Sequence, residues 1–199
     1  IYNMQSPRLF IGPASKNTID SVIELCNEGE NIGFIPSRRQ IDYKTGYVNN
    51  WTTKEFVNYV KKHNDSIIIT RDHSGPGQGS LKDDGIHSII EDTKNYFNFI
   101  HIDPWKIYKK IDEVANHSIN MIETCLRYNS SIRFEVGTEE SIRKYSPKEF
   151  ELYLKLLQSN LGEEKFKSIK YGVVQGGTKL SMNKNVGNFN SERMKEFIN

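Results

Sequence analysis

Residues 66–79 read SIIITRDHSGPGQG, and this stretch is the strongest indication of the fold class. It joins a short apolar run to charged residues and then to a glycine-rich loop, and no polar residue alternates within the apolar run. A strand that other layers cover on both faces has this composition, as in a parallel sheet. Polar side chains directly after such a strand are typical of α/β folds, which carry their chemistry at the carboxyl ends of the strands.

Five other apolar runs resemble this one, and helix-patterned stretches separate them. The six runs start near positions 9, 31, 66, 99, 132 and 171, so successive starts are 22 to 39 residues apart. This alternation predicts parallel strands in βα units rather than a β-sandwich. The predicted strands are residues 9–11, 31–35, 66–70, 99–102, 132–136 and 171–174.

The fold class is therefore α/β, and two architectures fit it. The spacing matches a parallel (β/α)₈ TIM barrel, which takes about 250 residues, so six units make an incomplete barrel. A doubly wound open sheet accommodates six units with no chain missing. No linker or composition break interrupts residues 1–199, which predicts one domain. The chain begins without methionine and stops at residues 196–199 within an amphipathic pattern, so we expect a truncation at the C-terminal end of the barrel.

Composition excludes several classes of protein. The 199 residues are 36% hydrophobic and 26% charged, which suits a globular domain and not a disordered chain. The net charge is +2 and there are no long runs of one sign, so the sequence does not indicate a nucleic-acid-binding surface. No apolar stretch approaches the ~20 residues of a membrane span, and residues 1–4 lack signal-peptide features, so a cytoplasmic location is expected. Cys26 and Cys125 have no CxxC or histidine spacing, which predicts free thiols.

The ends of strands three and four carry residues suited to acid/base and metal chemistry. Asp72 and His73 are adjacent, so a carboxylate acid/base can lie beside an imidazole ligand. His101 and Asp103 share one face of the next strand, where buried polar groups need partners such as a substrate or a metal. The alternative is structural: Asp72 caps a turn, and His101 and Asp103 hydrogen-bond each other to hold the loop.

Three further strand ends supply charged residues. On strand five, Glu135 shares a face with an arginine two residues earlier, either as an internal ion pair or as part of a site. After strand two, Arg38, Arg39 and Gln40 offer donors for phosphate or carboxylate, although a solvated arginine pair fits equally well. Lys179 follows strand six, where it suits a phosphate contact or, if desolvated, a Schiff-base nucleophile. P-loop and GxGxxG motifs are absent, so no nucleotide cofactor is expected.

The order of motifs carries a resemblance to a known family. The motifs are FIPSRRQID (34–42), RDHSGP (71–76), IHID (100–103), VGTE (136–139) and VQGG (174–177). Over nearly the whole chain this order resembles the accessory (Z-type, non-catalytic) subunit family of class II tagatose-bisphosphate aldolases and related ketose 4-epimerases. The DHxGP segment followed by IHxD and VGTE is the most specific part.

This resemblance implies a TIM barrel, sugar-phosphate substrates and a divalent metal, Zn, Mn or Co, which stabilises the enediolate formed when an aldol bond breaks. It implies that Asp72 is the catalytic acid/base, with Asp103 as the second catalytic carboxylate, and that His73 and Glu135 bind the metal. The residues expected to bind substrate are Arg38, Arg39, Gln40, His101 and Lys179.

Two departures from the family pattern bear on function. No histidine follows strand six, and a further histidine ligand would fall on a strand that this sequence does not contain. Arg71 stands where a small residue is expected, which indicates a different substrate anion or a closed site.

The preferred hypothesis is a sugar-phosphate aldolase or 4-epimerase in carbohydrate metabolism. The alternative is a non-catalytic accessory subunit that stabilises a class II aldolase, and a third reading is an open-sheet binding module. The expected partners are a phosphorylated sugar, together with a second copy of the chain or the catalytic subunit of an aldolase.

Overall fold

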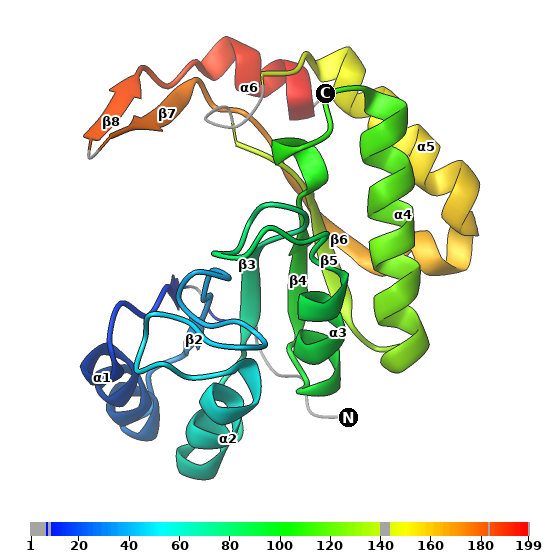
Figure 1. The fold of residues 1–199 in the computed structure, drawn as a ribbon. Helices are drawn as coiled ribbons and strands as arrows, with labels where there is room; N and C mark the ends of the chain where they lie inside the picture. Colours follow the sequence, from blue (N-terminus) through cyan, green and yellow to red (C-terminus); the bar gives the residue numbers. More distant parts are fainter. Residues whose placement is uncertain (1–6, 8, 140–143, 183, 199) are drawn as a thin grey trace.

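The computed structural model describes residues 7, 9–139, 144–182 and 184–198 (Figure 1). Residues 1–4, on which the expectation of a cytoplasmic location partly rests, lie outside this range. Within the described part of the chain, every helix is too short or too polar to traverse a bilayer.

Parallel strands follow one another in sequence order and confirm the predicted orientation. One parallel pair consists of β1 (Leu9–Ile11) and β2 (Ile32–Phe34). A four-stranded parallel sheet consists of β3 (Thr70–Ser74), β4 (Phe99–Ile102), β5 (Arg133–Gly137) and β6 (Ile169–Val173). Parallel bridges between Phe34 and Ile69 and between Ser37 and Asp72 join the pair to the sheet.

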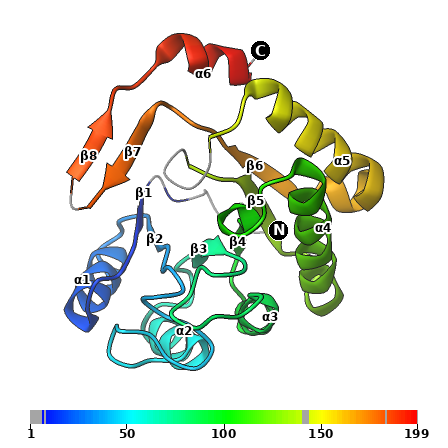
Figure 2. The same cartoon turned by 45° about the horizontal axis from the view of Figure 1, so that its top comes forward.

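Five long helices connect these strands and lie on one side of them. They are α1 (Lys16–Asn27), α2 (Thr53–His63), α3 (Ile86–Lys94), α4 (Ile111–Tyr128) and α5 (Pro147–Phe166), with a short 3-10 helix, η1 (Pro104–Lys106), after β4. Each of these long helices packs against the next. Figure 2 shows them along the outer side of an arc of strands, whereas a doubly wound sheet has helices on both faces. No pairing between described residues joins β6 to β1, so these strands form no closed barrel.

Local sequence explains where two of the helices begin. Thr52 caps α2 and Ser146 caps α5, each in a capping box with the glutamate three residues later. By contrast, α3 starts after Gly85 without a side-chain cap. The side chain of Asp83, two residues before this glycine, accepts hydrogen bonds from Arg38.

The strands bury their apolar side chains against the helices and turn other side chains to the concave face. Ile100, Ile102 and Phe134 belong to a core that includes residues of α3, α4 and α5. A second core lies around Phe34 and Phe56, between β2 and the first two helices. On the concave face, a cavity of about 160 Å³ is lined partly by Phe99, Glu135 and Tyr171.

The segment after β6 departs from the prediction. An antiparallel hairpin of β7 (Thr178–Ser181) and β8 (Lys184–Gly187) precedes α6 (Ser191–Ile198). Lys179 is an exposed residue of β7, paired in register with Val186, and not part of a loop that follows β6 directly. Arg193 ties α6 to the segments that follow β5 and β6, because its guanidinium donates to the carbonyls of Tyr145 and Gln175 at 2.5 and 3.2 Å.

Candidate acid/base and metal site

Polar side chains from three neighbouring strand ends meet at the carboxyl edge of the sheet. Asp72 and His73 belong to β3, Asp103 follows β4, and Glu139 lies beyond β5. The pairing of β3 with β4 is irregular at this point. His73 has a φ of 46°, in the left-handed region that non-glycine residues seldom adopt. Such a backbone costs about 1–3 kcal/mol and is found most often at functional sites.

His73 lies between two carboxylates. Its Nδ1 is 2.6 Å from Asp103 Oδ2, and its Nε2 is 2.9 Å from Glu139 Oε1. Asp72 Oδ1 is 3.5 Å from the same Nε2. Burial by itself lowers the pKa of His73, but the hydrogen bonds to Asp103 and Glu139 outweigh it and raise the pKa to about 10. At neutral pH the ring is therefore an imidazolium that donates both of its N–H groups.

Asp103 is fully buried, and its carboxylate fixes the orientation of the His73 ring. Besides the bond from His73, its Oδ2 accepts hydrogen bonds from Gln78 Nε2 at 3.0 Å and Thr138 Oγ1 at 3.3 Å. Its Oδ1 accepts the backbone N–H of Trp105 at 3.2 Å. The sequence suggested a bond between Asp103 and a histidine of its own strand, but the histidine that it binds comes from the neighbouring strand.

The other carboxylates near His73 differ in proton affinity. Burial raises the pKa of Asp72, and the charge of Glu139 adds to that rise. Burial also raises the pKa of Glu135, which pairs in register with His101 on the next strand. For Glu139 burial acts in the same direction, but the hydrogen bond from His73 outweighs it and the pKa is lowered. Asp72 and Glu135 therefore keep a proton to a higher pH than exposed acids do.

Among the described residues, two groups of side chains each bring three potential metal ligands within 4.8 Å of one another. His101 is oriented for such a role, because its Nε2 donates to the carbonyl of Gly137 at 3.0 Å and Nδ1 is the ring nitrogen that remains for a metal. Imidazole and carboxylate ligands together suit Zn, Mn or Co. Glu135, expected to bind metal, belongs to neither group. The groups are Asp72, His73 and His101, and His73, Asp103 and Glu139.

A cavity of about 980 Å³ opens beside Asp72, near the carboxyl ends of the first three strands. Arg39, Gln40 and Lys44 also line it, and they come from the loop after β2. Arg39 and Lys44 are exposed and contribute two positive charges to its wall. Gln40 Oε1 accepts the backbone N–H of Ser37 at 2.8 Å, which fixes its side chain in the wall. The structure thus brings Arg39 and Gln40 to the same cavity as Asp72.

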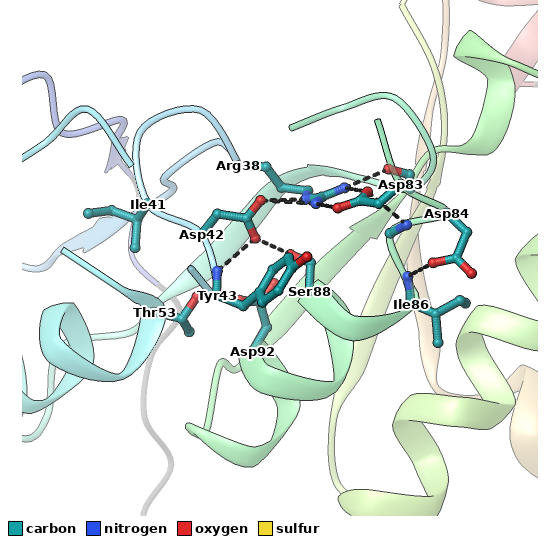
Figure 3. Close-up of polar contacts among 12 residues, drawn as sticks. Arg38, Ile41, Asp42, Tyr43, Thr53, Asp83, Asp84, Ile86, Ser88 and Asp92 are labelled. Carbon is teal, nitrogen blue, oxygen red and sulfur yellow. Dashed lines mark hydrogen bonds and ion pairs between the residues drawn. The ribbon is translucent and has the colours of Figure 1, made fainter. Parts of the chain in front are cut away.

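Arg38 does not face a ligand, in contrast to its predicted role in substrate binding (Figure 3). Its Nε and Nη2 contact Asp42 Oδ2 at 3.0 and 2.9 Å. Its Nη1 and Nη2 form a fork on Asp83 at 2.9 and 2.8 Å, and Nη1 also donates to the carbonyl of Gly75 at 3.0 Å. These contacts engage all the N–H groups of the buried guanidinium, so no donor is left for a substrate anion.

Arg71 points from β3 into the helix layer and not into the cavity. Its Nε and Nη2 donate to Asp92 of α3 at 2.7 and 2.6 Å. Its Nη1 donates to the carbonyls of Pro36 and Ile41 at 3.0 and 2.7 Å. Both side chains of the ion pair are fully buried. The expectation that Arg71 marks a different substrate anion is therefore wrong, because its charge is used within the chain.

Comparison with known proteins supports the fold. No protein-family model and no curated protein matches the chain. Among solved structures, the chain is similar to a probable tagatose 6 phosphate kinase from Sinorhizobium meliloti 1021, with a TM-score of 0.74 and 15% identity. The match covers 97% of this chain and 55% of that one, so the chain spans about half the length of this neighbour. At this identity the likeness concerns the fold alone.

Sequence reasoning missed three residues of the site. Glu139 ends the VGTE motif just beyond a predicted strand, so the strand-end rule already pointed to it. Gln78 and Lys44 lie in loops, and no local pattern indicates that the first reaches Asp103 or that the second lines the cavity beside Asp72. Only the folded loops reveal these contacts.

Proposed function

We propose that the protein is a sugar-phosphate aldolase or 4-epimerase that acts by retro-aldol chemistry, with Asp72 as its acid/base. We also propose that residues 1–199 are a single domain made of the first six units of a (β/α)₈ barrel. The layer of helices on one side of the strands supports the barrel (Figure 2). Active sites of such barrels lie at the carboxyl ends of the strands, which is where Asp72 and His73 are found.

The main support for the proposal is the position of Asp72 in the wall of the 980 Å³ cavity. A general base is more effective when its pKa is closer to neutrality, and burial raises the pKa of this carboxyl. The neighbouring His73 supplies a fixed positive charge, held by Asp103 and Glu139. A carboxyl that exchanges a proton beside a preorganised cation suits a reaction in which negative charge develops on oxygen.

In the proposed reaction, the Asp72 carboxylate accepts the proton of the substrate hydroxyl next to the bond that breaks. The carbon bearing that hydroxyl becomes an aldehyde, and the electron pair of the broken carbon–carbon bond moves to the other fragment as an enediolate. An aldolase releases the aldehyde, the enediolate takes a proton from solvent and leaves as the ketone fragment, and Asp72 returns its proton to solvent. A 4-epimerase turns it over, after which bond formation takes the proton back from Asp72. Arg39 and Lys44 bind the phosphate group at the far part of the cavity.

A divalent metal fits the donor set of the site. Asp72, His73 and His101 would hold it, and when bound it would stabilise the enediolate as a Lewis acid. Binding requires that His73 give up the proton on Nε2, so the bound metal would replace the imidazolium as the cation beside Asp72, and metal affinity would depend on pH.

The test is cleavage or 4-epimerisation of ketose mono- and bisphosphates by the natural full-length protein, with and without added divalent metal. Tagatose 6-phosphate enters the panel first, because the solved neighbour is described by that compound. We expect Asp72→Asn to lower turnover by about 10²-fold, the scale of a lost acid/base. The control is Asp65→Asn, which changes an exposed aspartate before β3 and should leave turnover unchanged.

Arg39→Ala should raise KM for the phosphorylated substrate and leave kcat nearly unchanged, because the phosphate is bound equally in the ground and transition states. If the wild type turns over none of these sugars but prolongs the activity of a co-expressed aldolase, the accessory-subunit hypothesis replaces the proposal. Phosphorylation of a sugar with consumption of ATP would also contradict it.

A further inference from the structure

The loop between β3 and α3 is tied down by Arg38. The guanidinium donates to the carbonyl of Gly75 at the start of this loop. It also forms the fork on Asp83 near the end of the loop (Figure 3). Asp83 then binds the loop itself: its Oδ1 accepts the N–H of Gly85 at 3.1 Å, and its carbonyl accepts the N–H of Gly77 at 3.3 Å. One buried side chain thus connects both ends of residues 75–85.

Close backbone contacts leave this loop little room to shift. A Cβ atom on Gly79 would lie 2.9 Å from both Arg38 Nη2 and Asp42 Oδ2, so the loop rests directly on the ion pair. Gly75 has a φ of 143°, and a Cβ atom there would lie 2.6 Å from the carbonyl oxygen of Asp103. The loop therefore contacts the Arg38 ion pair on one side and the backbone of the candidate site on the other.

Gln78 connects this loop to Asp103 in the candidate acid/base site. Its side chain is largely buried, and its Nε2 donates to the carbonyl oxygen of Asp103 at 3.2 Å and to Oδ2 at 3.0 Å. The same Oδ2 accepts the hydrogen bond from His73 at 2.6 Å. A displacement of Gln78 would remove one of the bonds that fix the carboxylate against the imidazole.

We propose that Arg38 and Asp83 act as positioning residues for the acid/base site, because they hold loop 75–85 so that Gln78 fixes Asp103 and, through it, His73. Neither residue touches the substrate. The expected effect on turnover rests on the proposed function. The mechanical link from Asp83 to Asp103 rests on the contacts alone.

A matched pair of variants tests the link. Asp83→Asn removes the charge that receives the Arg38 fork and replaces one of its oxygens by an amide nitrogen. Asp84→Asn is the control, because Asp84 is exposed and its Oδ1 only accepts the N–H of Ile86 at 3.0 Å, a bond that asparagine retains. Circular dichroism and urea unfolding first establish that both variants fold.

Hydrogen exchange followed by mass spectrometry gives a readout that needs no turnover. We expect Asp83→Asn to speed exchange at least tenfold in residues 75–85 and also in residues 103–105, and Asp84→Asn to change neither segment. Faster exchange in the loop without any change in residues 103–105 would overturn the proposal, as would an equal response of the two variants. If the wild type has no turnover but both segments respond, the proposed function fails and the mechanical link stands.

Kinetics test the consequence for the reaction. Asp83→Asn should lower kcat about tenfold and leave KM nearly unchanged, since a misplaced acid/base affects the chemical step more than binding. Gln78→Leu should have the same effect, and the double variant should be no slower than Gln78→Leu alone, because both act through one contact. Additive losses, or a loss that falls on KM alone, would show that Asp83 does not act through Gln78.

Discussion

Replacement of Asp92 by asparagine probes the claim that Arg71 is a structural cation. Arg71 and Asp92 have no exposed side-chain surface, and their closest N–O distance is 2.6 Å. Burial pushes the pKa of Asp92 upward, and the two hydrogen bonds from Arg71 oppose that shift. Asparagine preserves the size of the side chain but removes its charge, so the guanidinium remains buried without a counter-ion.

The loss should be large because the site is dry. Breaking a buried ion pair by removing one partner costs about 3–5 kcal/mol, since the remaining charge keeps its desolvation penalty. Arg71 also donates to the carbonyls of Pro36 and Ile41, and these bonds favour the lower half of that range. Against a typical stability of about 5–15 kcal/mol, such a loss moves the unfolding midpoint visibly.

Urea unfolding followed by tryptophan fluorescence measures this loss as a change in midpoint at constant slope. The control is Glu151→Gln on α5, where an ion pair with Lys155 has the same N–O distance of 2.6 Å but is exposed. Solvent screening makes the expected change at this pair too small to measure. If both variants unfold at the wild-type midpoint, Arg71 is not held by a buried charge and our assignment of its role is wrong.

Two further predictions concern pH and thiol chemistry. The folded pKa of His73 is about 10 against an ordinary value of 6.5, so its stabilising contribution is present in full below pH 6.5 and is lost as the pH rises through 10. With a chelator present, wild type should lose stability over this range relative to His73→Gln, and parallel stability curves would refute the assignment. Burial raises the pKa of the Cys125 thiol to about 12, so a thiol reagent should modify only the partly exposed Cys26 in the native state and both cysteines after unfolding. Rapid native modification of Cys125 would contradict the packing around it.

The parallel strands and the clustering at their carboxyl ends could be predicted because both follow from local patterns. Apolar runs such as residues 99–102 identify buried strands, and right-handed crossovers bring their ends together. Asp72, His73 and Asp103 therefore lie at one edge of the sheet, as the sequence indicated. The bond between Asp103 and His73 was not predictable, because it depends on the irregular end of β3 and the left-handed backbone of His73.

The roles of the arginines show the limit of strand-end reasoning. Arg38 and Arg39 are adjacent in one motif, yet Arg38 is buried in an ion-pair network and Arg39 lines the cavity. The difference arises because loop 75–85 brings Asp83 to Arg38. The two residues are 45 positions apart in the sequence, so no local pattern predicts this contact. Likewise, the charge of Lys179 suits a phosphate ligand, but the residue lies on a strand of the β7–β8 hairpin and not directly after β6.

The sharpest test of the retro-aldol proposal is NMR of a ketose phosphate incubated with the full-length protein in D₂O. If the protein is an aldolase, reprotonation of the enediolate by solvent places deuterium on the carbon next to the carbonyl of the released ketone fragment. If it is a 4-epimerase, the bond re-forms on the other face of the aldehyde and gives the 4-epimer without deuterium. We predict one of these two products with the wild type and formation about 10²-fold slower with Asp72→Asn. The absence of both products with the wild type, or an equal rate with Asp72→Asn, would contradict the assignment of Asp72 as the acid/base of this reaction.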